Sequence, residues 1–263
     1  MKSIIKIKNV SKTFYTKVQE IHVLKNIDFE IADEDFLIIF GKSGCGKSTL
    51  LHILLGLEVP TAGNVEFLGE YLYPNSADIN NSLVNDDQRG ELRKKYIGMV
   101  YQQPYWIKSL SVVENVAVPL ALSGVSESKR LKTAEQLLEQ LGLLEWAALS
   151  PKELSSGQQQ IAALARALAT DPKIIIADEP TGNLDYESGQ KLIELLSELN
   201  TKHKKTVIMV THDLEYLPYG KTVVKMFNGE ILNTSIYKDE EKKKLIEKIR
   251  QQREQDQKDI IDL

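Results

Sequence analysis

Apolar residues follow two kinds of pattern over the first forty positions. Residues 5–10 alternate apolar and polar side chains, and residues 24–31 alternate in a similar way. This two-residue period is typical of half-buried strands. Phe36–Phe40 is a continuous apolar run that ends at Gly41, as in strands that are buried on both faces. The N-terminal region is therefore predicted to be strands and turns that lead into one fully buried strand.

Two further apolar runs, at residues 174–177 and 206–210, are each followed by polar residues. Between them, residues 189–199 place leucines and an isoleucine at helical spacing. The order strand, helix, strand at this spacing indicates a parallel α/β sheet.

The middle of the chain has a helical pattern. Residues 112–149 are largely helical in pattern, and residues 155–169 are alanine-rich with one β-branched residue, Ile161. Residues 75–87 are polar and predict a surface loop. The predicted fold is an α/β core with an antiparallel N-terminal β region and an inserted α-helical lobe.

Residues 238–263 form a highly charged tail with equal numbers of acidic and basic side chains. Its acid-to-base pairs at i,i+4 support an exposed helix. Leu245, Ile246 and Ile249 give only a short apolar stripe, so a solvated helical tail is favoured over a docking helix.

Composition narrows the class of protein. The 263 residues are 42% hydrophobic and 27% charged, with a net charge of −4, which is ordinary for a globular protein and disfavours a nucleic-acid binder. The single cysteine, Cys45, excludes an intrachain disulfide and a cysteine-built zinc site. No apolar run reaches the roughly 20 residues of a membrane span, and the N-terminus does not resemble a secretory signal. We expect a cytoplasmic protein without direct membrane insertion.

A phosphate-binding motif follows the strand Phe36–Phe40. It matches G-x-x-x-x-G-K-[ST], the P-loop, and comprises Gly41, Lys42, Ser43, Gly44, Cys45, Gly46, Lys47, Ser48 and Thr49. The glycines let backbone N–H groups converge on phosphate oxygens, and the following helix directs its positive end at the same anion. Lys47 is expected near the β- and γ-phosphates, and the Ser48 hydroxyl can bind Mg²⁺. ATP with Mg²⁺ is therefore the expected ligand.

Two carboxylates, Asp178 and Glu179, end the buried strand at residues 174–177. In a P-loop protein, this end of a strand lies where Mg²⁺ and the attacking water belong. Asp178 is assigned to the metal side and Glu179 to the general base.

The motif at residues 154–158, Leu-Ser-Ser-Gly-Gln, decides the subclass. It is similar to the signature Leu-Ser-Gly-Gly-Gln of ATP-binding cassette (ABC) transporter ATPases, and the resemblance extends from residue 1 to about 235. It implies a P-loop NTPase (RecA-like) core and a head-to-tail dimer in which the signature of one protomer contacts the ATP of the other. The signature residues are Ser155, Ser156, Gly157 and Gln158. Ser156 stands where the family usually has glycine.

The resemblance also implies roles for other residues. Gln102 matches the Q-loop glutamine, which touches Mg²⁺ or the lytic water, and His212 matches the switch histidine at the γ-phosphate. Asp185 matches the D-loop aspartate at the dimer seam. Phe14 matches the aromatic residue that stacks on adenine, and the adjacent Tyr15 is the alternative for that role. One departure is the acidic turn at residues 33–35, where the family has a glycine. There we expect a different turn geometry without consequence for the chemistry.

Residues 178–185 and 111–120 are most similar to the subgroup that includes lipoprotein-releasing, macrolide-exporting and cell-division ATPases. The resemblance implies an ATPase domain at 1–237, with a core at about 1–95 and 158–237 and a lobe at about 96–157. It implies two partners, a second copy and a separate membrane permease, with the chain peripheral on the inner face of the membrane. The alternative is a regulatory subunit of a cell-envelope or cell-division complex that does not drive transport.

Overall fold

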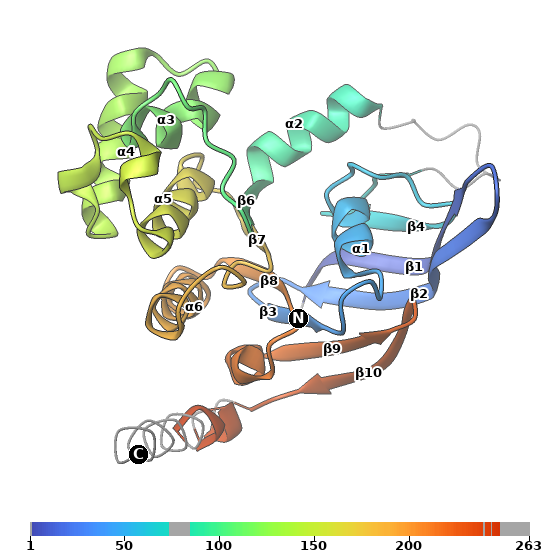
Figure 1. Cartoon of the computed structure of the whole chain (residues 1–263). Helices are drawn as coiled ribbons and strands as arrows, with labels where there is room; N and C mark the ends of the chain where they lie inside the picture. The colour runs from blue at the N-terminus through green and yellow to red at the C-terminus, as the bar shows by residue number, and fades with distance from the viewer. Residues whose placement is uncertain (1, 74–84, 239, 243, 248–263) are drawn as a thin grey trace.

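Two β-sheets, with helices between and around them, organise the chain (Figure 1). The computed structural model describes residues 2–73, 85–238, 240–242 and 244–247. The strands are β1 (Ser3–Tyr15), β2 (Glu20–Ala32), β3 (Phe36–Phe40), β4 (Ala62–Phe67), β5 (Glu70–Tyr71), β6 (Ile97–Tyr101), β7 (Ile174–Asp178), β8 (Thr206–Thr211), β9 (Thr222–Phe227) and β10 (Glu230–Ile236). The α-helices are α1 (Lys47–Leu54), α2 (Asp86–Tyr96), α3 (Val112–Leu122), α4 (Glu127–Gln140), α5 (Ser156–Leu168) and α6 (Tyr186–Thr201). Short 3₁₀ helices are η1 (Leu144–Trp146), η2 (Pro151–Glu153) and η3 (Leu214–Tyr219).

The larger sheet has the strand order β10-β9-β3-β8-β7-β6. Its strands from β9 to β6 are parallel, and β10 is an antiparallel edge strand. The second sheet is antiparallel, with the order β2-β1-β4-β5. The predicted α/β class, with a parallel core sheet and an antiparallel N-terminal region, is confirmed.

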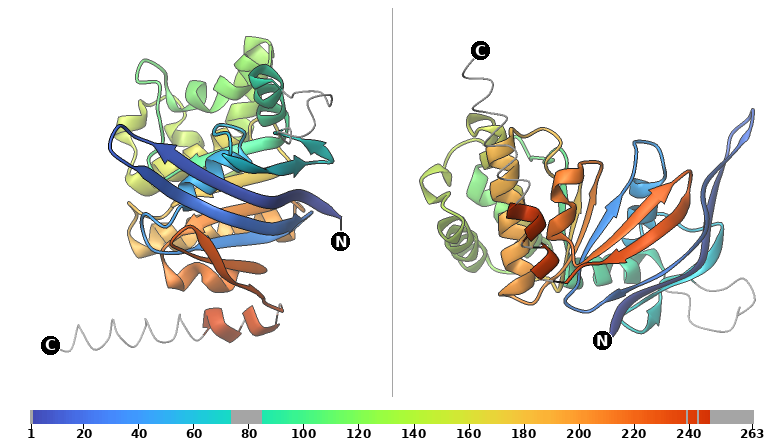
Figure 2. Two further views of the ribbon diagram at one scale, coloured as in Figure 1. Left: turned by 90° about the vertical axis from the view of Figure 1, so that its right-hand side faces the viewer. Right: turned by 90° about the horizontal axis from the view of Figure 1, so that it is seen from below.

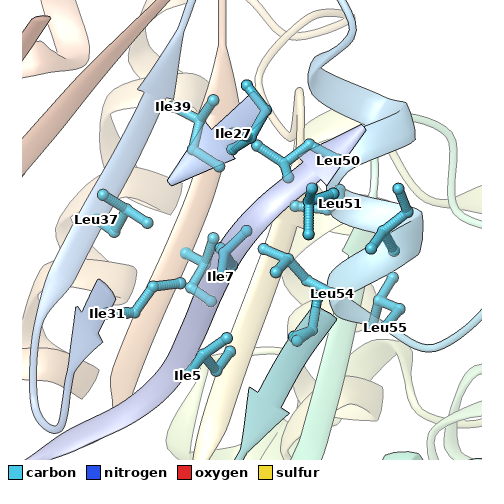
Figure 3. Close-up of a cluster of buried hydrophobic side chains, with 14 of the residues drawn as sticks. Ile5, Ile7, Ile27, Ile31, Leu37, Ile39, Leu50, Leu51, Leu54 and Leu55 are labelled. Carbon is cyan, nitrogen blue, oxygen red and sulfur yellow. The ribbon is translucent and has the colours of Figure 1, made fainter. Parts of the chain in front are cut away.

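The two faces of the parallel sheet bury different side chains. On β3, Leu37 and Ile39 face a cluster that lies between the two sheets, whereas Phe36 and Ile38 face a cluster that includes residues of α5, α6 and η3. Helix α1 fills the space between the sheets, and Figure 3 shows its leucines facing Ile5 and Ile7 of β1. Since side chains of a strand alternate between faces, burial of both faces explains why β3 is apolar throughout.

The helical lobe has a separate apolar cluster. Residues of α3, α4 and α5 build it, among them Val116, Leu138 and Ile161. Figure 2 shows this lobe and the β1–β2 hairpin at opposite ends of the molecule. Helix α5 contributes Ala162 to the lobe cluster. It contributes Leu164 to the cluster formed with α6 and η3 on one face of the parallel sheet, called here the cluster beneath the parallel sheet. It is therefore buried on two sides, which explains its many alanines.

Two segments differ from their sequence patterns or fall partly outside the described residues. Residues 75–84 of the expected loop lie outside the described residues, and residues 86 and 87 belong to α2. In the tail, residues 240–242 and 244–247 are helical, and Ile246 packs against the cluster under the sheet while Leu245 is exposed. Ile249 lies outside the described residues. Among all the residues that the structure describes, no helix has both the length and the hydropathy needed to cross a bilayer.

Side chains from neighbouring elements fix the acidic turn between β2 and β3. Glu34 has a left-handed backbone, with φ of 60°. Its N–H donates to the Thr206 hydroxyl at 3.0 Å, and its carbonyl accepts from Asn200 Nδ2 at 3.1 Å. Lys173 pairs with Asp33 at 2.7 Å. These contacts explain how a non-glycine residue holds a conformation that costs L-residues roughly 1–2 kcal/mol.

Asp35 is the next residue of this turn, and its carboxyl should lower the free energy of unfolding by an amount that depends on pH. It is 4% exposed, and burial raises the pKa of its carboxyl, opposed by a hydrogen bond from Thr222 and the charge of Lys221. Because the folded pKa is raised, the ionised form is disfavoured in the folded state, and the cost vanishes as pH falls below the unfolded value near 3.8. We expect Asp35→Asn to raise the free energy of unfolding at pH 7 by about 1 kcal/mol.

Urea unfolding at pH 7 and at pH 3.5 measures this effect. The gain should be present at pH 7 and absent at pH 3.5, whereas Glu135→Gln, at an exposed position in the middle of α4, should change neither value. A loss of stability at pH 7 in Asp35→Asn would show that the ionised carboxylate makes a net favourable contact.

Candidate nucleotide-binding site

The P-loop connects β3 to α1 as the sequence predicted. Gly46 precedes α1 with φ of 103°, and a Cβ there would lie 2.8 Å from the carbonyl oxygen of Val23. Gly44 also has positive φ, at 78°. The loop therefore needs glycine at position 46 for two reasons, its backbone conformation and the close approach of β2.

Lys47 is held across the loop by backbone carbonyls. Its Nζ donates to Gly41 O at 2.8 Å and to Lys42 O at 3.2 Å, and lies 3.4 Å from Glu179 Oε1. The side chain is only 5% exposed. A buried ammonium at the start of a helix concentrates positive potential where a phosphate would bind.

Asp178 ends β7 and lines the same pocket as Ser48, whose hydroxyl lowers the pKa of the Asp178 carboxyl. Burial raises the pKa of its carboxyl, and the neighbouring Glu179 carboxylate raises it further, while His52, Ser48 and Lys47 oppose the shift. Its Oδ1 is buried without a hydrogen-bond partner in the described structure. An unpartnered carboxylate oxygen next to a hydroxyl fits a hard cation such as Mg²⁺, which prefers oxygen ligands.

Glu179 follows in a left-handed backbone conformation, with φ of 47°. Its N–H donates to Val210 O at 2.9 Å, and its carbonyl accepts from Gly182 N at 3.1 Å. Its two carboxylate oxygens contact Lys47 and His212 Nδ1. The His212 side chain is 60% exposed, whereas that of Glu179 is 18% exposed. His212 is therefore the solvent-exposed member of the Glu179–His212 pair, and the Glu179 carboxylate lies deeper, against Lys47.

Gln102 follows β6, the strand that pairs with β7. Its side chain lies against Gly182, where an added Cβ would come within 2.7 Å of Gln102 Nε2. Its carbonyl accepts from Asn183 Nδ2 at 3.5 Å. The segment after Glu179 thus packs directly on Gln102.

The signature residues begin α5. Ser155 caps this helix: its Oγ accepts from Gln158 N at 3.2 Å, and its N–H donates to Gln158 Oε1 at 2.8 Å. Ser155 and Ser156 are exposed and Gly157 is buried. A Cβ on Gly157 would lie 2.6 Å from Ser188 Oγ of α6. Asp185 caps α6 and accepts from Ser188, so the signature and the predicted D-loop are packed together.

The P-loop and the carboxyl ends of β6, β7 and β8 surround one pocket of about 640 Å³. Its lining is Val23, Phe40, Gly41, Lys42, Ser43, Gly44, Gly46, Lys47, Ser48, Thr49, Gln102, Asp178, Glu179 and His212. Most of the predicted nucleotide-binding and catalytic residues meet here. Val23 and Phe40 were not predicted; Val23 is brought in by the packing of β2 on the loop, which no local pattern signals.

Several predicted site residues lie outside this lining. Phe14 is 37% exposed, with the Lys12 ammonium 4.8 Å from its ring centre. Cys45 is buried behind the loop, where its Sγ would contact a Cβ placed on Gly41. None of residues 155–158, nor Asp185, lines the pocket.

The structure also bears on how a metal would be held. In the described ranges, no three His, Cys, Asp or Glu side chains gather into a metal cluster. The predicted ligands Ser48, Asp178 and Gln102 all line the pocket, where they would hold Mg²⁺ together with phosphate oxygens, which is the usual way that proteins bind this ion. The ion's chemistry would be charge neutralisation on the phosphates.

Comparisons with known proteins agree with this geometry. Residues 24–182 match the family model for ABC transporter. The chain is 41% identical to the lipoprotein-releasing system ATP-binding protein LolD of Psychrobacter arcticus, covering 87% of this chain and 98% of that one. It is 38% identical to the macrolide export ATP-binding/permease protein MacB of Escherichia coli, covering 89% of this chain and 35% of that one. The solved dimer of the cassette MJ0796 bound to ADP and Pi has a TM-score of 0.79 at 37% identity, over 89% of this chain and 99% of that one.

The chain therefore belongs to the ABC transporter family, as an ATP-binding subunit with ATPase activity. The fold prediction and the predicted subgroup are both confirmed by these relatives. The roles of individual residues stay predictions.

The predicted role of Lys47 in binding the phosphates of ATP can be tested by substitution. Lys47→Ala removes the buried ammonium, and charged hydrogen bonds of this kind contribute about 1.5–3 kcal/mol. We expect ATP to bind about 10- to 100-fold more weakly in a titration with a fluorescent nucleotide. Lys202→Ala, at a surface ion pair of α6, should bind as wild type. Near-normal affinity and turnover in Lys47→Ala would refute the assignment of the loop.

Proposed function

We propose that the chain hydrolyses ATP between two copies of itself and that opening and closing of this dimer drives a separate membrane permease. The observation that carries the proposal is the separation of the signature from the nucleotide pocket of the same chain. Ser155 and Ser156 are exposed at the N-terminus of α5 but do not line the pocket. An exposed helix N-terminus favours an anion, so a phosphate bound in a second copy is the expected partner.

The proposed roles follow from the contacts. Glu179 accepts a proton from the attacking water, and His212 and Lys47 surround the γ-phosphate. Ser48, Asp178 and Gln102 hold Mg²⁺ and the water, and the P-loop amides hold the β- and γ-phosphates. Phe14 stacks on adenine, and residues 155–158 with Asp185 complete the site from the second copy. The solved dimer of MJ0796 with ADP and Pi supports this arrangement.

The proposed lobe, at about residues 96–157, is joined to the proposed core by β6, a strand of the large sheet, and by α5. Movement of the lobe would therefore change the relation of the signature to the P-loop. Hinge motions of this kind couple ligand binding to an attached partner. LolD is named for lipoprotein release and MacB for macrolide export with its own permease, which supports an export or release permease at the inner face of the membrane.

Glu179→Gln tests the mechanism, because it keeps the shape of the side chain and removes the base. Hydrolysis should fall by about 10²- to 10⁴-fold while ATP still binds. The protein should then be a dimer with ATP and a monomer without it, as measured by light scattering on a sizing column. Glu187→Gln, in the first turn of α6, should hydrolyse ATP as wild type.

Adding Ser155→Arg to Glu179→Gln should abolish the ATP-dependent dimer, since a bulky cation would block the contact in trans. The same measurement should be repeated on the subunit co-expressed with its permease, because association of the isolated copies can be too weak to detect. Glu179→Gln protein that hydrolyses ATP at the wild-type rate, or stays monomeric with ATP in both settings, would contradict the proposal.

Ser156 offers a test of how closely the copies approach. It is exposed in the first turn of α5 and adds a Cβ where the family has glycine. In the Glu179→Gln background, Ser156→Gly should lower the ATP concentration that gives half-maximal dimer by about threefold, a gain of under 1 kcal/mol. A rise would mean that the serine makes a favourable contact of its own.

A further inference from the structure

Gln160 is a buried polar residue of α5 that no sequence motif assigned to the site. It is 2% exposed, and its Nε2 donates to Tyr101 O at 2.7 Å and to Pro180 O at 2.8 Å. Its side-chain amino group thus uses both hydrogens on backbone carbonyls of two other segments. Buried donors are normally satisfied in this way, and here the two acceptors lie in different segments of the chain.

The two carbonyls belong to the neighbours of predicted catalytic residues. Tyr101 immediately precedes Gln102, and Pro180 immediately follows Glu179. Tyr101 is also the register partner of Asp178 in the β6–β7 pair. The Gln160 amide therefore lies across the carboxyl ends of two adjacent parallel strands, where the sheet no longer holds the chain.

Glu179 needs such support because its backbone is left-handed. A non-glycine residue at φ of 47° carries a cost of roughly 1–2 kcal/mol and keeps that conformation only when its surroundings determine it. Val210 O and Gly182 N hold Glu179 itself, and Gln160 holds the next residue. On the other strand, Asn183 and Gln160 hold the carbonyls of Gln102 and Tyr101.

The same helix presents the signature. Gln160 lies four residues after Ser156, about 6 Å along the helix axis. Helix α5 is packed in the lobe cluster on one side and the cluster beneath the sheet on the other, and Gly157 is in close contact with α6. A displacement of its exposed N-terminus is therefore passed to the Gln160 amide with little internal bending.

We propose that Gln160 is a positioning residue, through which contact of the signature end of α5 with the second copy sets the spacing of Gln102 and Glu179 in the protomer's own site. This inference rests on the proposed function, in which the signature binds ATP of the second copy. It assigns Gln160 no contact with ATP. Substitution of Gln160 should therefore lower the turnover rate and leave the affinity for ATP unchanged.

Gln160→Met is the main variant, because methionine has similar length, suits a buried helix position and donates no hydrogen bond. We expect kcat to fall about tenfold, the scale of a small misplacement of reacting groups, while the affinity for ATP changes less than twofold. Gln136→Met, at an exposed position of α4, should leave both unchanged. Thermal unfolding confirms that each variant is folded at the assay temperature.

Gln160→Glu adds a second measurement, the pH dependence of turnover, which should not change if Gln160 only stabilised the fold. An ionised carboxylate has no hydrogen to donate and would face two carbonyl oxygens, whereas the protonated acid donates one hydrogen bond. Relative to wild type at each pH, turnover of Gln160→Glu should therefore recover as pH falls from 8 to 5.5. Gln160→Met should show no such recovery.

Folded Gln160→Met with turnover within twofold of wild type would overturn the inference, as would equal losses of kcat and ATP affinity. A Gln160→Glu deficit that does not change with pH would also overturn it. Wild-type protein and Glu179→Gln, assayed in parallel, separate this result from the proposed function. If wild-type turnover depends on Glu179 but not on Gln160, only the positioning role fails.

Discussion

Burial of the parallel sheet on both faces is the constraint on which the rest of the structure depends. Leu37 and Ile39 must face the cluster around α1, and Phe36 and Ile38 must face the opposite cluster. A shift of one residue in register would exchange these faces. The packing of apolar side chains therefore also fixes where each strand ends relative to its neighbours.

The chemistry is concentrated at those strand ends. Phe40 is the register partner of Thr211, Asp178 that of Val210, and Tyr101 that of Asp178. The residues that follow these positions are the P-loop, Glu179, His212 and Gln102. Because all four strands are parallel, their carboxyl ends lie at one edge of the sheet, so groups from distant parts of the sequence share one pocket.

Helix α5 connects this pocket to the surface where a second copy is proposed to bind. Its N-terminus presents the exposed Ser155, its middle carries the Gln160 amide against the two strand ends, and both its flanks are buried. The contact of Gly157 with Ser188 joins it to α6, which Asp185 caps. A helix with one exposed end and a buried side-chain amide that makes two hydrogen bonds is suited to couple closure of a dimer to the geometry of hydrolysis.

The sequence by itself determined the elements whose signal is local. Apolar runs predicted β3, β7 and β8, and helical spacing predicted α6. The glycines and Lys47 of the P-loop identified the nucleotide site, because backbone conformation and charge at that turn depend on residues adjacent in the chain. By contrast, α2 has no buried residue and so lacks the apolar pattern by which a helix is predicted, and its first two residues fell in the predicted loop.

Tertiary structure decided what depends on contacts distant in the sequence. The left-handed backbone of Glu179 is held by Val210 and Gly182, and Gln160 contacts segments 59 and 20 positions away. Phe14 and Cys45, which the family resemblance and the P-loop motif assigned to the nucleotide site, do not line the pocket of the single chain, and their roles stay predictions. Sequence patterns report which side chains are buried and which turns are possible, whereas the partners of a buried polar group are set only when the sheet and its helices pack together.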